Sequence, residues 1–510
     1  MEKQTSGARR KQKTKNRKAG VLLPVFSLPG KYGIGSFGKE ARAFLDGIAA
    51  QGFTVWQVLP LTPTGYGDSP YQSECGYAGN PYFIDLETLQ KEGLLTKGEL
   101  ASAKTPQAQT RVDYGDLYRT RLPLLRKAYA RFTPDEDYLA LKKDEEMATY
   151  ALFSAIKHLS GGKCWQEWEE GLRLRKRSAI ARFQKEHADE IGFRLFLQYE
   201  FRRQWAALKA YANARGIEIF GDMPLYVSYD SVEVWSSPEL FRLDEERRPT
   251  LVAGVPPDYF SENGQLWGNP VYDYAAQKKD GYRFWKRRIR YGLTLFDRLR
   301  IDHFRGLDRF YAVPAGAETA RNGAWYDGPK EELFRGFRHA PLVAEDLGTT
   351  DDSLKRFLKN VGYPGMRVLS FMFDGNPENP HLPANYVKNA VAYTGTHDNP
   401  PLLSLLQGQN ADAKAGTFRI LGEQCRALGL PFSAKSDRGF LEKSIEAVLY
   451  SAADLAIIPF FDLLRRGEEA RVNTPGDASG KNWTVRLAGR DLQKLCRLPV
   501  KDLIENSGRA

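Results

Sequence analysis

The chain has 510 residues, of which 42% are hydrophobic and 12% aromatic, so it can bury a large core and is not an intrinsically disordered polypeptide. Its net charge is +11, but the first twenty residues hold eight Lys or Arg and one Glu, which leaves only four net charges for the other 490. A nearly neutral body argues against nucleic acid as a specific partner. No apolar run of about 18 residues is present, so the sequence predicts no membrane span.

The first twenty residues show no apolar periodicity, and we expect residues 1–20 to form a disordered basic tail. The cysteines are widely spaced, without a Cys-x-x-Cys pair, and suggest neither a disulfide framework nor a zinc site. They are Cys75, Cys164, Cys425 and Cys496. A reducing cytoplasm is therefore the expected location.

Strand and helix patterns alternate along the rest of the chain. Amphipathic helices are expected at 39–52, 191–215 and 284–295. The second of these places Trp205, Leu208 and Ala212 on one face and ends at Gly216. The expected strands are 21–27, 53–61, 217–222, 298–304, 341–346, 366–373, 389–396 and 455–460. Eight strands with intervening helices predict a single (β/α)₈ barrel over residues 21–510.

Two segments are too long for simple crossovers and are expected to be insertions. Residues 66–190 have a charged, largely helical pattern. Residues 228–282 are expected to hold an aromatic substrate loop, since 255–270 is bounded by Pro and Gly and carries Tyr, Phe, Gln and Trp.

A glycine pattern near the start, Gly33-x-Gly35-x-x-Gly38, matches the dinucleotide-binding fingerprint. The expected strand ends several residues before Gly33, and no acidic residue lies near position 58 to bind a ribose. The sequence therefore disfavours nucleotide binding here.

Four carboxylates, Asp222, Asp302, Glu345 and Asp398, stand at the carboxyl ends of expected strands. In a barrel these ends share one face, so the four side chains should converge. Cleaving a glycosidic bond needs one ionised carboxylate at the anomeric carbon and one protonated carboxyl at the leaving oxygen. Arg300, two residues before Asp302, is suited to keeping Asp302 ionised, and neighbouring negative charge would hold Glu345 protonated.

Several ordered motifs resemble those of the amylomaltases, the 4-α-glucanotransferases of the α-amylase clan, from about residue 20 to the end. They are the aromatic segment 255–270 and the stretches 32–38, 69–72, 221–224, 300–306, 344–348, 395–399 and 469–473. The basic tail lies outside the family pattern, and Val472 stands where Met is expected.

The resemblance implies that Asp302 is the nucleophile, Glu345 the acid/base, and Asp398 a third carboxylate that grips sugar hydroxyls. It also implies a set of glucan-binding residues, namely Ser69, Tyr71, Asp222, Gln265, Trp267, Arg300, Asp374, His397 and Asn473. The expected activity is transfer of α-1,4-glucan segments to glucose or maltooligosaccharide acceptors by a retaining double displacement, without a metal or organic cofactor.

Three alternatives stay open at this point. A hydrolase or a phosphorylase of the same clan would share the carboxylates and differ only in the acceptor, whereas a glucan-binding protein without activity would not require three converging acids. A metal site of two His and one carboxylate around His303 and His397 is a further, weaker alternative.

Overall fold

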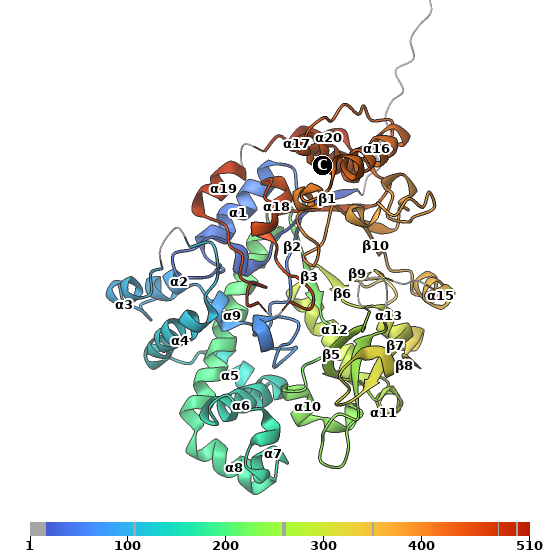
Figure 1. Cartoon of the computed structure of the whole chain (residues 1–510). Helices are drawn as coiled ribbons and strands as arrows, with labels where there is room; N and C mark the ends of the chain where they lie inside the picture. Colours follow the sequence, from blue (N-terminus) through green and yellow to red (C-terminus); the bar gives the residue numbers. More distant parts are fainter. Residues whose placement is uncertain are drawn as a thin grey trace, which may run out of the picture.

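A computed structural model describes residues 17–105, 109–257, 262–348, 351–477, 479–495 and 498–509. Its centre is a sheet of eight parallel strands, which confirms the eight strands expected from the sequence (Figure 1). They are β1 (Lys18–Leu22), β2 (Val55–Gln57), β3 (Glu218–Met223), β6 (Arg298–Ile301), β9 (Leu342–Ala344), β10 (Gly365–Val368), β11 (Ala390–Tyr393) and β12 (Leu455–Pro459).

The sheet curls into a nearly closed barrel. Its order is β10-β11-β12-β1-β2-β3-β6-β9, and the Ala344 N–H of β9 donates to the Pro364 carbonyl just before β10, at 2.9 Å. Most strand residues are fully buried, as expected where side chains fill the barrel inside and helices cover it outside. All eight carboxyl ends therefore open on one face.

The helices that follow the barrel strands are mostly amphipathic and bury one face. They are α1 (Lys39–Ala50), α12 (Arg283–Leu295), α13 (Arg305–Asp308), α14 (Lys330–Leu333), α15 (Asp352–Val361), α16 (Ala411–Ala427), α17 (Asp437–Tyr450), α18 (Phe460–Leu463), α19 (Gly489–Leu495) and α20 (Lys501–Asn506).

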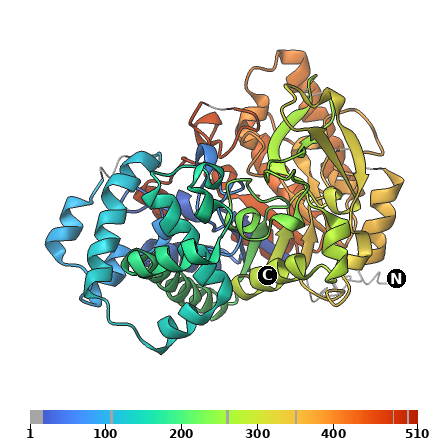
Figure 2. The ribbon, with the colours of Figure 1, turned by 90° about the horizontal axis from the view of Figure 1, so that it is seen from below.

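The insertion between β2 and β3 forms a helical lobe on one side of the barrel (Figures 1 and 2). Its helices are α2 (Leu86–Lys91), α3 (Lys97–Ser102), α4 (Tyr114–Arg131), α5 (Glu136–Lys143), α6 (Glu145–Leu159), α7 (Glu170–Arg173) and α8 (Arg177–Glu186). The long helix α9 (Ala188–Asn213) contacts several helices of the lobe as well as β3 of the barrel. It buries Trp205, Leu208 and Ala212, as predicted, and the chain turns at Gly216 with φ +72°.

The second insertion differs from the expected loop. It contains α10 (Val232–Ser236), α11 (Tyr274–Lys279) and an antiparallel hairpin of β4 (Leu251–Val255) and β5 (Gln265–Pro270). With β7 (Arg309–Pro314) and β8 (Ala324–Asp327) the hairpin builds a four-stranded sheet that the sequence interpretation missed. Gln265 and Trp267 therefore stand on a strand, while residues 258–261 at the hairpin turn lie outside the described residues.

The boundary of the basic tail is also corrected. Strand β1 begins at Lys18, and Arg17 already donates to the carbonyls of Leu449, Ser451 and Ser507. The expected disorder of residues 1–16 lies outside the described residues. The strand ends at Leu22 because Pro24 offers no N–H, and a 3₁₀ turn at Val25–Ser27 replaces the expected continuation.

The two ends of the described chain are joined by a buried arginine. Arg509 is fully buried, and its guanidinium donates to Lys18 O in β1, to Leu449 O in the last turn of α17, and to Ser451 O and Ala453 O after that helix. Across the described residues, no helix has the length and apolar character needed to cross a membrane.

Candidate active site

Arg300 links two of the expected carboxylates at the carboxyl ends of β3 and β6. Its Nη1 donates to Asp222 Oδ2 at 2.6 Å and its Nη2 donates to Asp302 Oδ1 at 2.7 Å. The two anions raise the pKa of Arg300 well above its usual value although burial acts to lower it. Asp222 is fully buried, whereas the side chain of Asp302 is 27% exposed, so only Asp302 is open to a ligand.

A second group of side chains joins Asp222 to Asp398. The Tyr71 hydroxyl donates to Asp222 Oδ2 at 2.7 Å, lies 3.1 Å from His397 Nε2, and its ring stacks on that of His397 at 5.4 Å. His397 Nε2 lies 3.4 Å from Asp398 Oδ2, and Asn473 Nδ2 donates to Asp398 Oδ1 at 2.6 Å. Asp398 keeps 41% of its side chain exposed on the open face.

Glu345 follows β9 and is held by two backbone donors. Its Oε2 accepts from the His303 N–H at 2.7 Å and its Oε1 from the Leu347 N–H at 2.8 Å. Such bonds favour the ionised form, yet burial and the charge of Asp302 raise the pKa of Glu345 to about 8. Its neighbour Asp346 instead accepts from Met366 N–H at 2.6 Å and from Arg367 Nη1 at 3.1 Å. Asp346 is thus held by residues of β10 and not by the partners of Glu345.

His303 connects this carboxyl to the hairpin. It adopts φ +44°, and burial lowers its pKa to about 4, so its ring is neutral at physiological pH. The Trp267 ring meets it edge-on at 4.7 Å, and Trp267 Nε1 donates to Gln265 Oε1 at 3.2 Å. Gln265 and Trp267 thus border the side of the site that holds Glu345.

Ser69 and Asp374 complete the predicted set. Ser69 Oγ accepts from the Tyr71 N–H at 3.2 Å and so belongs to the same cluster. Asp374, beyond β10, is exposed and accepts from Asn376 N–H in its own loop at 3.0 Å, without a hydrogen bond to the other site residues among the described interactions. Described contacts therefore link eleven of the twelve predicted residues, directly or through His303, and none of the described hydrogen bonds links Asp374 to them.

One aromatic neighbour was not predicted. Trp483 is buried and packs against Tyr71 at 5.6 Å and His397 at 5.8 Å between ring centroids. It lies ten residues beyond Asn473, and its short segment shows no periodicity or motif that could have identified it from sequence.

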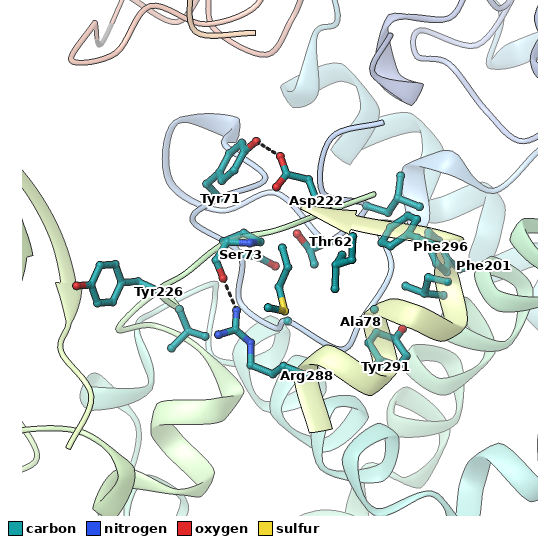
Figure 3. Close-up of a pocket in the computed structure, with 18 residues that line it drawn as sticks. Thr62, Tyr71, Ser73, Ala78, Phe201, Asp222, Tyr226, Arg288, Tyr291 and Phe296 are labelled. Atoms are coloured by element: carbon teal, nitrogen blue, oxygen red, sulfur yellow. Dashed lines mark hydrogen bonds between the residues drawn. The ribbon is translucent and has the colours of Figure 1, made fainter. Parts of the chain in front are cut away.

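A small cavity lies behind Tyr71 and Asp222, lined mainly by apolar groups such as Phe201 and Phe296 (Figure 3). Its volume of about 40 Å³ suffices for a few water molecules and not for a sugar ring. Asp222 Oδ1 is buried and accepts no hydrogen bond from the described residues. A ligand of sugar size therefore has to bind on the open face, above Asp302 and Asp398.

A metal centre finds no support in the side chains that the structure describes, because none of their His, Cys, Asp and Glu groups form a cluster of three that could hold an ion. His303 and His397 instead face Trp267 and Tyr71, as described above.

Comparisons with known proteins identify relatives of this chain. A sequence model described as 4-alpha-glucanotransferase matches residues 23–492. The 4-alpha-glucanotransferase of Thermus thermophilus is 44% identical over 490 residues, which cover 93% of this chain and 96% of that protein. The enzyme of the same name from Clostridium butyricum is 41% identical over 476 residues, covering 91% and 95%.

Solved structures give the same result. An amylomaltase from Streptococcus agalactiae in complex with acarbose has a TM-score of 0.90 and 36% identity, with 97% of this chain and 100% of that chain covered. An amylomaltase from Corynebacterium glutamicum shares the fold at a TM-score of 0.80 and 19% identity, covering 97% and 75%. The family resemblance seen in the sequence motifs is thereby confirmed, and the chain belongs to the 4-alpha-glucanotransferases.

Proposed function

We propose that this transferase moves α-1,4-glucan segments between chains by a retaining double displacement, with Asp302 as nucleophile and Glu345 as acid/base. The observation that carries the mechanism is the different surroundings of the two carboxyls. Arg300 binds Asp302 directly, whereas burial raises the pKa of Glu345 to about 8, so Glu345 holds a proton at neutral pH.

In the first step an oxygen of Asp302 attacks the anomeric carbon while the glycosidic bond breaks, and Glu345 gives its proton to the departing oxygen. In the second step the Glu345 carboxylate takes a proton from an acceptor hydroxyl. That oxygen attacks the anomeric carbon and releases Asp302. The backbone N–H groups of His303 and Leu347 hydrogen-bond Glu345 and keep it in place through both steps.

Asp398 is proposed to hold sugar hydroxyls. Its oxygens are oriented by Asn473 and His397, and its exposed side chain leaves further lone pairs free to accept hydroxyl protons. Such bonds help distort the ring towards the oxocarbenium-like transition state.

The remaining predicted residues divide by exposure. Trp267, Gln265, Ser69 and Asp374 are partly or fully exposed and are proposed to contact the glucan directly. Asp222 is fully buried beneath Tyr71 and Arg300, so we assign it to holding these two side chains. The proposed acceptors are glucose and maltooligosaccharides.

We also propose that the protein acts in the cytoplasm. The three described cysteines are free thiols, and Cys75 and Cys425 are buried, which suits a reducing compartment.

Incubating the purified protein with maltotriose tests the proposal. Transfer yields glucose together with a ladder of longer glucans. Glucose and maltose alone would indicate hydrolysis, a requirement for inorganic phosphate and release of a sugar phosphate would indicate phosphorolysis, and unchanged maltotriose would indicate binding without turnover. Any of these three outcomes would contradict the proposed reaction.

A further inference from the structure

Two amide side chains outside the predicted set join the two sides of the site. Gln72 Nε2 donates to Asn269 Oδ1 at 3.2 Å, and Asn269 Nδ2 donates back to Gln72 Oε1 at 3.3 Å. Gln72 Nε2 also lies 3.4 Å from the Trp267 carbonyl, and Asn269 Nδ2 donates to the Val227 carbonyl at 2.9 Å. Asn269 is 5% exposed and Gln72 is partly buried, so water has only limited access to the pair.

Each partner is close in sequence to a residue of the site. Gln72 directly follows Tyr71, whose hydroxyl contacts Asp222 and His397. Asn269 is two residues beyond Trp267 on β5, and both side chains contact the same segment after β3: the Trp267 ring lies 6.2 Å from the Tyr226 ring, and Asn269 donates to the next carbonyl, that of Val227. Trp267 in turn contacts His303, whose N–H holds Glu345.

The pair therefore bridges two structures that come from separate insertions. The loop after β2 carries Tyr71 on the side of Asp222 and Asp398, and the β4–β5 hairpin carries Trp267 on the side of Glu345. Neither amide contacts Asp302, Glu345 or Asp398 in a described hydrogen bond. Both are thus positioned to act through their neighbours and not on the reacting atoms.

We infer that Gln72 and Asn269 are positioning residues that fix the distance between the Tyr71 loop and the Trp267 hairpin, and so favour a sugar acceptor over water. This inference rests on the proposed function. A sugar acceptor reaches the glycosyl-enzyme only when both walls hold it in line, whereas water is small and present at about 55 M, so it needs no such alignment. Removing the Gln72–Asn269 hydrogen bonds should therefore lower the rate of transfer more than the rate of hydrolysis.

The reciprocal pairing explains why both residues are amides. Each side chain must donate and accept at once, which Asn and Gln do and carboxylates or apolar side chains do not. Gln72→Met keeps the length of the side chain and removes its donor and acceptor. Asn269→Leu does the same on the hairpin, but it also leaves the Val227 carbonyl without its partner, so it carries the greater risk to folding.

The experiment compares wild type, Gln72→Met, Asn269→Leu and the double variant with maltotriose as donor. It measures the longer glucans formed and, in the same samples, the net increase in reducing ends, which hydrolysis produces and transfer does not. Gln166→Met is the matched control, since Gln166 also donates through its amide, to the Glu246 carbonyl, but lies in the helical lobe. Thermal unfolding of every variant separates a change at the site from loss of fold.

We expect Gln72→Met to lower kcat/KM for transfer roughly ten- to a hundred-fold, the effect of a displacement of about 1 Å, and to lower hydrolysis less. The hydrolysed fraction should rise several-fold with an unfolding temperature close to wild type. The double variant should keep as much transfer activity as the less active of the two single variants, because both changes remove the same Gln72–Asn269 pair. The control should match wild type.

An unchanged ratio of transfer to hydrolysis in folded Gln72→Met would overturn the inference. A loss of transfer in the double variant equal to the product of the losses in the two single variants would also overturn it. If wild type itself does not form glucans longer than maltotriose, the proposed function fails and the inference fails with it. A wild-type ladder with an unchanged ratio in Gln72→Met rejects the inference alone, so the two failures are distinguishable.

Discussion

Single carboxyl groups decide the chemistry at the residue scale. Asp302→Asn and Glu345→Gln each preserve shape and remove, respectively, the nucleophile and the acid/base, so transfer should fall by several orders of magnitude. The measurement is product formation from maltotriose, with thermal unfolding as the check on folding. Near-normal turnover of either folded variant would contradict its assigned role.

Glu345 also predicts a pH dependence of activity. With a pKa of about 8, its acid form is lost as the pH rises through that value, so kcat/KM should decline above about pH 8. A rate that stays constant to pH 10 would contradict the assignment.

The same group contributes to stability with a defined sign. The folded protein binds this proton more tightly than the unfolded chain, whose Glu titrates near 4.5. The contribution of Glu345 to the free energy of unfolding is therefore fully present below about pH 4.5 and lost as the pH rises through about 8. Glu345→Gln should accordingly become more stable relative to wild type with rising pH, as urea unfolding at several pH values would show.

The sequence was informative about this site where spacing along one strand fixes geometry. Arg300 and Asp302 are two residues apart, so their contact could be predicted from strand alternation. The packing of Trp483 against Tyr71 and His397 could not, since it depends on contact between segments far apart in the sequence. Gln72 lay inside a recognised motif, but its partner Asn269 is fixed only by the hairpin.

At the scale of elements, α18 positions the loop that carries His397 and Asp398. Asp462 of α18 is buried, and it accepts from Thr394 Oγ1 at 2.7 Å and from Leu402 N–H at 2.8 Å. These donors lie on either side of the His397–Asp398 segment, so one carboxylate holds both of its ends.

Asp462→Asn should therefore weaken this segment. An amide has only one oxygen, so one of the two donors would face an NH₂ group. We expect the free energy of unfolding to fall by about 1–3 kcal/mol, the cost of an unsatisfied buried group, together with reduced transfer. Urea unfolding and the maltotriose assay measure both, and Asp412→Asn on the exposed start of α16 serves as the control. Unaltered stability would show that the segment does not depend on Asp462.

The elements themselves could be predicted unevenly. The barrel strands are apolar runs bounded by helices, and all eight were located within a few residues. The hairpin was missed because Gln265–Pro270 contains Gly and Pro and little apolar alternation. Its pairing with β4, and that of β4 with β7, supply stability that local sequence does not reveal.

For the whole molecule, the two termini should differ in their effect on stability. Deleting residues 1–16 removes positive charge and no described contact, so transfer and unfolding temperature should stay at wild-type values. Deleting residues 1–18 also removes Arg17 and the start of β1, with a loss of about 1 kcal/mol for each hydrogen bond broken. Equal unfolding temperatures for the two truncated proteins would contradict the structural role of Arg17 and Lys18.

The pairing of β1 with β12 has a consequence for synthesis on the ribosome. Lys18 pairs with Leu455, which is translated more than 400 residues later, and Arg509 comes later still. At a translation rate of about 5–20 residues per second, the edge of β1 that pairs with β12 stays unpaired for roughly 20 to 90 s. An open strand edge invites association with other nascent chains, and adjacent positive charge opposes it. We expect the eight Lys and Arg among the first twenty residues to oppose such association during that interval.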